Sequence, residues 1–275
     1  MPTTDELISL NEAADRLGVH YMTAYRYVRT GRLHGIKDGA EWRVRASDVE
    51  ALRQPSEAPR PRRRRTDYAT RLEERLLVGD ESGAWSIIDG AMASGMDPSL
   101  VYQQLVAPAM VSVGERWAND EIDVSQEHLA SAVVLRLIGR LGPRFSRRGR
   151  KKGTVLLAGP AGEHHGIPLA MVGDLLRGRG YDVADLGPDV PPASLARAVT
   201  SMPRLVAIGL CATSPNLTAS LKASIAATRE VSDVPVVVGG SGVGPEDASV
   251  WTGADHVTGS VDELLDLIDS LAALR

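Results

Sequence analysis

The chain has 275 residues, 43% of them hydrophobic and 24% charged, with a net charge of −4, a balance typical of a globular protein with a large core. No apolar run approaches the roughly 18 residues of a membrane span, and the acidic start lacks the basic region of a secretory signal. The single cysteine, Cys211, excludes a disulfide framework and a cysteine-based zinc site. We therefore expect a cytoplasmic protein that does not associate with membranes.

Charge and composition both divide the chain. Residues 1–65 hold 13 Lys and Arg against 9 Asp and Glu, whereas the remainder holds 18 against 26, which predicts a polyanionic partner for the N-terminal part alone. A linker rich in proline and arginine occupies residues 55–65, and a second boundary falls at Gly142-Pro143. The expected folding units are 1–54, 66–142 and 151–275.

The first unit shows the spacing of a helix-turn-helix. Ser9 and Asn11 are candidate N-caps for a helix over 12–17, and Gly18 ends that helix. A second helix over 21–30 follows within three residues, as in helix-turn-helix motifs.

A hairpin and a last short helix complete this unit. Residues 35–37 and 42–44 flank an Asp38-Gly39 turn, and Ser47 is a candidate N-cap for a helix over 48–53. The run LNEAADRLGVHYMTAYRYVRTGRL resembles the winged-helix DNA-binding domains of the excisionase and MerR-like families.

This resemblance implies that the second helix reads the major groove of double-stranded operator DNA while the hairpin contacts phosphates. A single charged residue of this kind is as often merely solvated, but helix spacing, hairpin and basic tail together favour DNA binding. The expected DNA-contacting residues are Tyr21, Thr23, Arg26, Arg29, Lys37, Arg43 and Arg45.

The second unit contains no credible strand. The predicted helices cover 68–77, 81–92, 99–117 and 125–141. Asp80, Asp97 and Asp123 stand near three of the helix starts, where N-caps belong. Four amphipathic helices joined by short turns predict a four-helix bundle.

The third unit alternates short apolar strands with helices. This pattern predicts a five-stranded, doubly wound parallel α/β domain of the Rossmann or flavodoxin-like type. The expected strands are 154–158, 183–185, 206–210, 236–238 and 256–257, and the expected helices are 169–177, 194–200, 217–229 and 261–274, with a short element at 246–251. Ligands of such sheets bind beyond the carboxyl ends of the strands.

Three of these strand ends carry a recognisable trio: Glu163-x-His165, Cys211-x-Thr213, and Gly239-Gly240 followed by Ser241. An imidazole near an acid can ligate a metal while the carboxylate orients its ring, although a lone histidine on a loop is more often solvated. The glycine run 239–244 follows the fourth strand instead of the first, so a pyridine-nucleotide site is not predicted.

The trio resembles the cobalamin-binding domain of methionine synthase and related corrinoid proteins. The resemblance implies that His165 is the lower cobalt ligand, that Glu163 is its partner, and that the glycine loop accepts the nucleotide tail of the cofactor. His164 is the adjacent alternative ligand. Pro168 and Cys211 depart from the family pattern, which has Gly and Ser at these positions.

The bundle sequence extends the resemblance. Trp117 is followed, after nine residues, by Glu127-His128. This spacing resembles the adenosylcobalamin-dependent, light-sensing CarH/LitR-type repressors, in which a Trp and a Glu-His pair surround the 5′-deoxyadenosyl group. Taken alone, Trp117 and His128 are more often core residues. Light sensors of this family often carry His after the Trp, where this sequence has Ala118.

The sequence therefore predicts a transcriptional regulator of the repressor type, and not an enzyme, that depends on adenosylcobalamin and light. It is expected to form a homodimer or homotetramer when it binds the cofactor and to rearrange after the cobalt–carbon bond is cleaved. Three alternatives stay open: a cobalamin-responsive regulator not gated by light, a corrinoid methyl-carrier protein of a methyltransferase system, and a degenerate site that takes another chromophore or metabolite.

Overall fold

The computed structural model describes residues 6–19, 21–29, 33–38, 41–53, 68–214, 216–243 and 253–274. Three hydrophobic cores organise these residues. One core belongs to the N-terminal unit, a second to one face of a parallel sheet, and the third is shared between the other face and the helical bundle. Within the described ranges, no helix is long and apolar enough to cross a membrane.

The N-terminal unit combines three helices with a small antiparallel sheet of order β1-β3-β2. Ser9 caps the first helix by accepting a hydrogen bond from the Glu12 N–H at 3.2 Å, and Gly18 ends it in the left-handed conformation, as predicted. The elements are β1 (Leu7–Ser9), α1 (Leu10–Leu17), α2 (Tyr21–Arg29), β2 (Gly35–Asp38), β3 (Glu41–Arg45) and α3 (Ala46–Arg53).

Two features of this unit differ from the sequence prediction. The three-residue strand β1 was not predicted, because it is too short to show an alternating pattern. The prediction of Ser47 as an N-cap is wrong, because α3 begins at Ala46. The Ala46 N–H donates to the Glu6 carbonyl at 2.9 Å, so the chain passes from the sheet into the helix without a capping loop. The predicted turn residue Gly39 and the linker 55–65 lie outside the described residues.

The predicted bundle helices are confirmed, with one irregularity. The side chains of Asp80, Asp97 and Asp123 accept backbone hydrogen bonds at the starts of α5, α6 and α8. The third predicted helix is interrupted by a π-helical stretch. The elements are α4 (Tyr68–Leu77), α5 (Glu81–Ala93), α6 (Pro98–Val101), the π-helix η1 (Tyr102–Val106), α7 (Ala107–Ala118), α8 (Val124–Leu141) and the 3-10 helix η2 (Gly142–Phe145).

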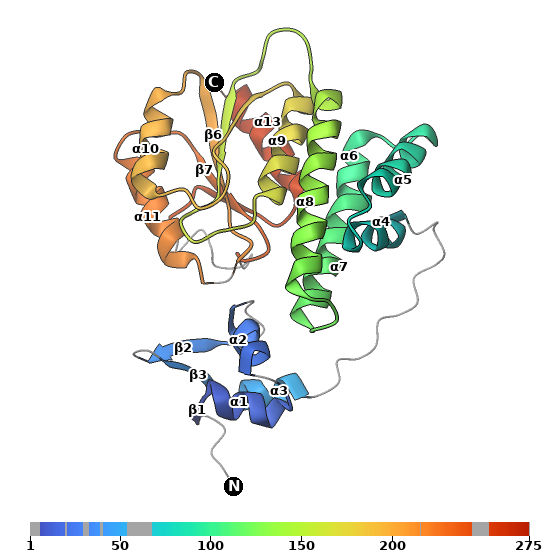
Figure 1. Ribbon diagram of the computed structural model, residues 1–275. Coiled ribbons are helices and arrows are strands. Elements are labelled where there is room, and N and C mark those ends of the chain that lie inside the picture. The colour runs from blue at the N-terminus through green and yellow to red at the C-terminus, as the bar shows by residue number, and fades with distance from the viewer. Residues whose placement is uncertain are drawn as a thin grey trace.

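The predicted parallel α/β domain is also confirmed. Its five strands lie in the order β5-β4-β6-β7-β8 and are all parallel. Helices α10 and α11 cover one face, and α9 and α13 cover the other (Figure 1). The elements are β4 (Thr154–Ala158), α9 (Ile167–Arg179), β5 (Asp182–Asp185), α10 (Pro192–Ser201), β6 (Leu205–Cys211), α11 (Thr218–Arg229), β7 (Val236–Gly239), β8 (His256–Thr258) and α13 (Val261–Ala273). The predicted element at 246–251 lies outside the described residues.

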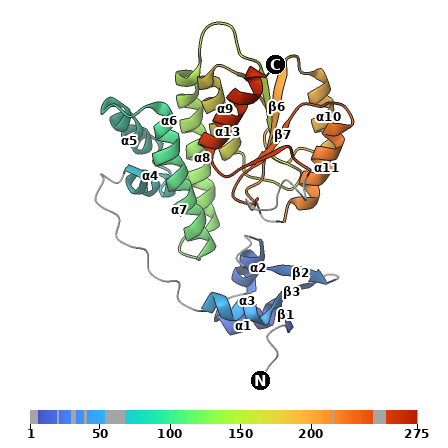
Figure 2. The same ribbon diagram turned by 180° about the vertical axis from the view of Figure 1, so that it is seen from behind.

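The bundle is joined firmly to the face that α9 and α13 cover. Tyr102 stacks on Phe145 with ring centroids 5.0 Å apart, and its hydroxyl donates to the buried carboxylate of Asp174 at 2.7 Å. Arg177 donates to the other oxygen of Asp174 at 3.0 Å. Both views show α8 running beside the α/β domain (Figure 1 and Figure 2). The junction therefore sets the position of α7 and α8 relative to the sheet.

Candidate functional site

The site centres on Glu163, in the loop between β4 and α9. Its side chain is completely buried, and both carboxylate oxygens accept hydrogen bonds. Oε1 accepts from the His165 N–H at 2.9 Å and from the Ser214 hydroxyl at 3.1 Å. Oε2 accepts from the Ser214 N–H at 2.9 Å and from the Thr213 N–H. Two loops that are about fifty residues apart in sequence are thus tied together by one carboxylate.

These bonds determine the charge of Glu163. Burial by itself would raise the pKa of this carboxyl, because it disfavours the charged form. The hydrogen bonds from His165, Ser214 and Thr213 outweigh burial and hold the pKa of Glu163 well below its usual range. Glu163 is therefore a fixed buried anion at the carboxyl edge of the sheet.

His165 is held by this anion and is nevertheless accessible. Its Nδ1 lies 2.6 Å from Glu163 Oε1, while 60% of its side chain is exposed. The hydrogen bond with Glu163 raises the pKa of His165, against the opposing effect of burial. Because Nδ1 is engaged, Nε2 is the ring nitrogen left for a ligand. His164 is exposed and, among the described residues, makes no hydrogen bond.

The last residue of β6, Cys211, and the loop that follows it supply two of the predicted residues. Burial, with a further contribution from the charge of Glu163, raises the pKa of the Cys211 thiol to about 11, so this thiol stays protonated. The hydroxyl of Thr213 is buried beside the Cys211 thiol, whose pKa it lowers, and among the described residues it makes no hydrogen bond of full geometry. An unsatisfied buried hydroxyl is costly, which makes Thr213 Oγ1 a candidate contact for a bound ligand.

The glycine loop after β7 packs directly on this second loop. Gly240 has a φ of +112°, and a Cβ there would lie 2.3 Å from the Ala212 carbonyl oxygen. A Cβ on Gly242 would lie 2.3 Å from the Ser214 carbonyl oxygen. Gly239 accepts from the Ala212 N–H at 2.9 Å, and Ser241 is exposed beside them. Glycine is thus required here so that the two loop backbones can lie in contact.

The bundle places its predicted residues near the same edge. Trp117 is half-buried on α7 and packs against the core shared by the bundle and the sheet. Glu127 accepts from the Ser131 hydroxyl at 2.7 Å and lies 2.6 Å from His128 Nδ1, and 74% of the His128 side chain is exposed. The charge of Glu127 contributes to the raised pKa of His165, so the two elements share one electrostatic environment. Ala118 ends α7.

The structure describes only part of the predicted DNA-contacting set. On α2, Tyr21 is 40% exposed and stacks on Tyr25, whereas Thr23 is only 9% exposed and offers little surface to a base. Arg43 and Arg45 lie on β3, and Arg45 is exposed. The side chains of Arg26, Arg29 and Lys37 lie outside the described residues.

Sequence reasoning did not single out Ser214. Its hydroxyl lies 3.1 Å from Glu163 Oε1 and 3.3 Å from His165 Nδ1. The sequence did predict that the loop after the third strand of the α/β domain, which is β6, faces the site, and Ser214 lies in that loop. No residue pattern within that loop distinguishes Ser214 from its neighbours.

Three family models match the chain. A helix-turn-helix domain matches residues 7–55, and two models, both described as B12 binding domains, match residues 68–141 and 153–268. A B12-binding module joined to a helix-turn-helix domain defines a cobalamin-binding transcriptional regulator.

Individual relatives agree with this class. The chain is 31% identical to the HTH-type transcriptional repressor CarA of Myxococcus xanthus, over 72% of this chain and 67% of CarA. It is 30% identical to the HTH-type transcriptional repressor CarH of the same organism, over 65% of this chain and 59% of CarH. The chain belongs to the CarA/CarH family of regulators. The monomethylamine corrinoid protein of Methanosarcina barkeri shares the fold, with a TM-score of 0.62 at 18% identity over 74% of this chain and 96% of that protein.

Proposed function

We propose that this protein is a repressor that binds operator DNA and adenosylcobalamin, and that light changes its assembly by cleaving the cobalt–carbon bond of the cofactor. One observation carries the cofactor part of the proposal. The buried Glu163 fixes an exposed His165 at the carboxyl edge of the sheet, within the electrostatic reach of Glu127 on the bundle.

The residues present fit a cobalamin. His165 offers Nε2 as the lower cobalt ligand, and Glu163 keeps the ring in one orientation through Nδ1. Thr213 contributes a buried hydroxyl that makes no hydrogen bond of full geometry with the residues the structure describes. Cys211 and Gly239 end β6 and β7, Gly240 and Ser241 follow in the next loop, and these residues would hold the nucleotide tail of the cofactor. When bound, the cofactor supplies a cobalt–carbon bond that visible light breaks.

The bundle residues Trp117, Glu127 and His128 cover the upper face of the cofactor in this proposal. Trp117 fills space beside the adenosyl group, so the position of α7 reports whether that group is present. Glu127 orients His128 through Nδ1 and is itself held by Ser131. The ligand thereby biases an equilibrium between two arrangements of the bundle.

The N-terminal unit, residues 1–54, is the winged helix-turn-helix in this proposal, and the basic linker 55–65 tethers it to the bundle (66–142) and the cofactor domain (151–275). A single small DNA-binding unit binds weakly. Tethering two or four such units in a homodimer or homotetramer raises the affinity by avidity. Assembly on adenosylcobalamin would therefore switch operator binding on.

The test is the size of the protein in solution, measured by light scattering, together with its affinity for DNA. Protein is loaded with adenosylcobalamin or methylcobalamin and measured in darkness and after green light. We expect assembly and tight DNA binding with adenosylcobalamin in darkness only. Identical size and affinity under all four conditions would contradict the proposal.

Ala118 favours one second candidate, a cobalamin-responsive regulator that is not gated by light. Alanine has no side-chain group that can take the upper cobalt position after photolysis. This candidate predicts assembly with adenosylcobalamin that illumination does not reverse. The corrinoid methyl carrier predicts instead that methylcobalamin-loaded protein hands its methyl group to a partner methyltransferase, with no effect of either cofactor on DNA affinity.

A further inference from the structure

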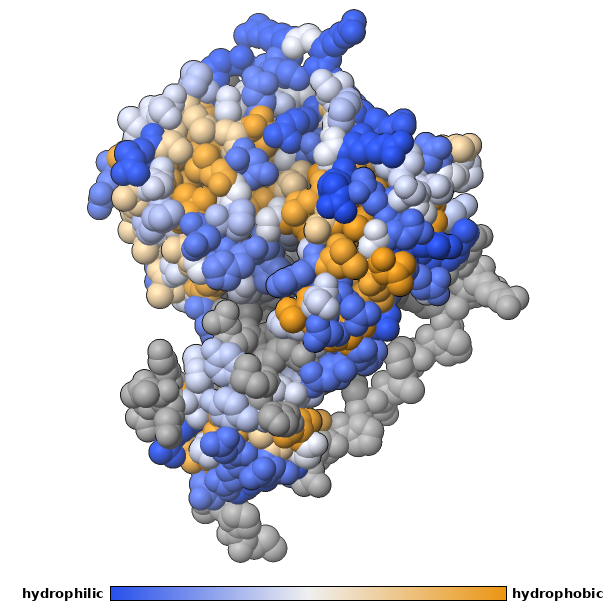
Figure 3. Space-filling model, in the orientation of Figure 1, coloured by the Kyte–Doolittle hydropathy of each residue, from blue (hydrophilic) through white to orange (hydrophobic). Residues whose placement is uncertain are grey.

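The segment that joins the bundle to the α/β domain is strongly cationic. Residues 144–152, here called the basic connector, contain no acid. Their basic residues are Arg144, Arg147, Arg148, Arg150, Lys151 and Lys152. Figure 3 shows deep blue, hydrophilic side chains at the top of the molecule, where Figure 1 draws this segment between α8 and β4. Such a concentration of positive charge contrasts with the net negative charge of the chain.

Most of these cations lack an acidic partner. Lys152 pairs with Asp269 at 2.6 Å. Among the described residues, the other five make no salt bridge, and all of them except Lys151 are exposed. Their charge is therefore not neutralised by any acid among the residues that the structure describes.

The C-terminal half of the connector is anchored. The Lys152 N–H donates to the Gly180 carbonyl at 3.0 Å, and Arg204 donates to the Lys151 carbonyl at 2.6 Å. Lys151 Nζ in turn donates to the Arg147 carbonyl at 2.7 Å. Less conformational freedom is lost when an anchored segment binds a partner.

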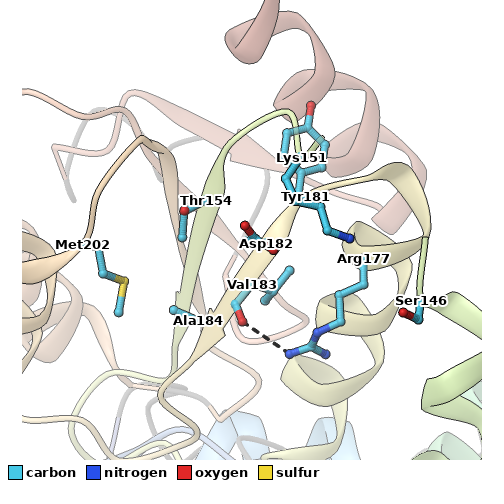
Figure 4. A pocket seen from close by; sticks show the side chains of 9 residues that line it. All are labelled: Ser146, Lys151, Thr154, Arg177, Tyr181, Asp182, Val183, Ala184 and Met202. Carbon is cyan, nitrogen blue, oxygen red and sulfur yellow. Dashed lines mark hydrogen bonds between the residues drawn. The ribbon is translucent and has the colours of Figure 1, made fainter. Parts of the chain in front are cut away.

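Two surface pockets flank the connector. One, of about 340 Å³, is lined by Lys151 and Ser146 together with Arg177 of α9, and Asp182 also lines it (Figure 4). The other, of about 280 Å³, is lined by cationic and acidic side chains. These are Arg144, Arg147, Arg179, Asp97 and Asp262. Cations of the connector therefore line two surface pockets, in which acidic side chains are also present.

We propose that the basic connector is a second DNA-contacting surface, which binds the phosphate backbone without reading sequence. The connector leads into the amino end of β4, whereas His165 follows the carboxyl end of the same strand, so the connector does not belong to the cofactor site. A membrane surface would also attract these cations, but the chain matches a helix-turn-helix domain, which makes duplex DNA the polyanion favoured here. The inference rests on the proposed DNA-binding function.

The test compares two triple variants of the full chain, both loaded with adenosylcobalamin in darkness. The first is Arg147→Gln, Arg148→Gln and Arg150→Gln in the connector. The second, matched in charge, is Arg71→Gln, Arg197→Gln and Lys222→Gln, at exposed positions on α4, α10 and α11. Affinity for a mixed-sequence duplex of about 40 base pairs is measured between about 50 and 200 mM salt. An unchanged cobalamin absorption spectrum verifies that each variant is folded.

For the connector variant we expect a log–log salt slope shallower by about 2 to 3 per protomer, because each phosphate contact contributes about 0.9. The matched variant should keep the slope of the unsubstituted protein. Equal slopes in all three proteins, or equal changes in both variants, overturn the inference. The inference is also overturned if the connector variant loses binding to anionic lipid vesicles while the salt dependence of its DNA binding is unchanged. If the unsubstituted protein does not bind DNA at all, the proposed function itself fails.

Discussion

Among the residues that the structure describes, two acid–histidine pairs look alike locally and differ in their surroundings. In both, a carboxylate oxygen lies 2.6 Å from a histidine Nδ1: Glu163 with His165, and Glu127 with His128. Glu163 is fully buried and accepts hydrogen bonds from two loops. Glu127 accepts one further bond from its own helix, at Ser131, and 74% of the His128 side chain is exposed.

This difference separates two roles. The pair of Glu163 and His165, here called the lower pair, lies in a loop that hydrogen bonds fasten to the loop of a neighbouring parallel strand, so its geometry is set before any ligand arrives. Glu127 and His128, here called the upper pair, are neighbours on α8, so their position depends on how the bundle packs. We therefore assign the affinity for the cofactor to the lower pair and the response to the adenosyl group to the bundle.

The largest loss of cobalamin affinity is expected when the loops that hold Glu163 and His165 are forced apart. In Gly240→Ala, the new Cβ would lie 2.3 Å from the Ala212 carbonyl oxygen. This clash would push the loop after β6 away from Glu163. Cobalamin binding should be lost, as measured by equilibrium dialysis. The matched control is Gly180→Ala, where φ is +95° but the added carbon would meet no described atom within 4 Å apart from its own backbone neighbours. This control carries only the left-handed strain of about 1 to 2 kcal/mol and should still bind. Equal binding by both variants would contradict the account.

The comparison is tested next by neutralising each acid in turn. Glu163→Gln places an amide opposite N–H donors and weakens the hold on His165. We expect cobalamin affinity to fall by about 10- to 100-fold, the usual cost of losing the partner of a metal-bound histidine. Glu127→Gln should change the affinity by less than this. If Glu127→Gln is the more damaging substitution in a titration followed by absorbance, the assignment of roles is reversed.

A smaller effect is expected at the junction that positions the bundle. Tyr102→Phe keeps the stacking on Phe145 but removes the hydroxyl that donates to Asp174 at 2.7 Å. Because Asp174 is buried, the free energy of unfolding should fall by about 1 to 3 kcal/mol. Urea unfolding followed by circular dichroism measures this. An unchanged midpoint would show that the bundle is held by apolar packing alone.

Trp117→Ala should have the smallest effect on cobalamin affinity. It should nevertheless abolish the dependence of assembly on the adenosyl group. His165 and its partners are untouched, so binding should persist, while size in solution should no longer distinguish adenosylcobalamin from methylcobalamin. Trp85→Ala, in the same bundle, is the control: Trp85 packs against the bundle core and carries Arg140 over its ring at 3.7 Å. A purely structural role for Trp117 predicts a stability loss of about 3 to 5 kcal/mol in both variants with the response retained.

The sequence predicted what depends on local pattern. The aspartate N-caps, the parallel strands and the loop that carries Glu163 and His165 all have short-range signals. It did not predict the bonds from Thr213 and Ser214 to Glu163, because these follow from β4 and β6 lying side by side, with Ala158 opposite Leu210. The same holds for Tyr102, whose partner Asp174 lies 72 residues further along the chain, and for the π-helical stretch in which Tyr102 lies.

The measurement that tests the central claim most directly is electron paramagnetic resonance of the protein loaded with cob(II)alamin. The splitting of the cobalt signal identifies the nitrogen in the lower position. With histidine labelled by the heavy nitrogen isotope, we predict that the splitting changes from a three-line to a two-line pattern. The pattern should be lost in His165→Ala and kept in His164→Ala. A splitting that labelling leaves unchanged, or that disappears only in His164→Ala, would contradict the claim that His165 on the buried Glu163 holds the cofactor.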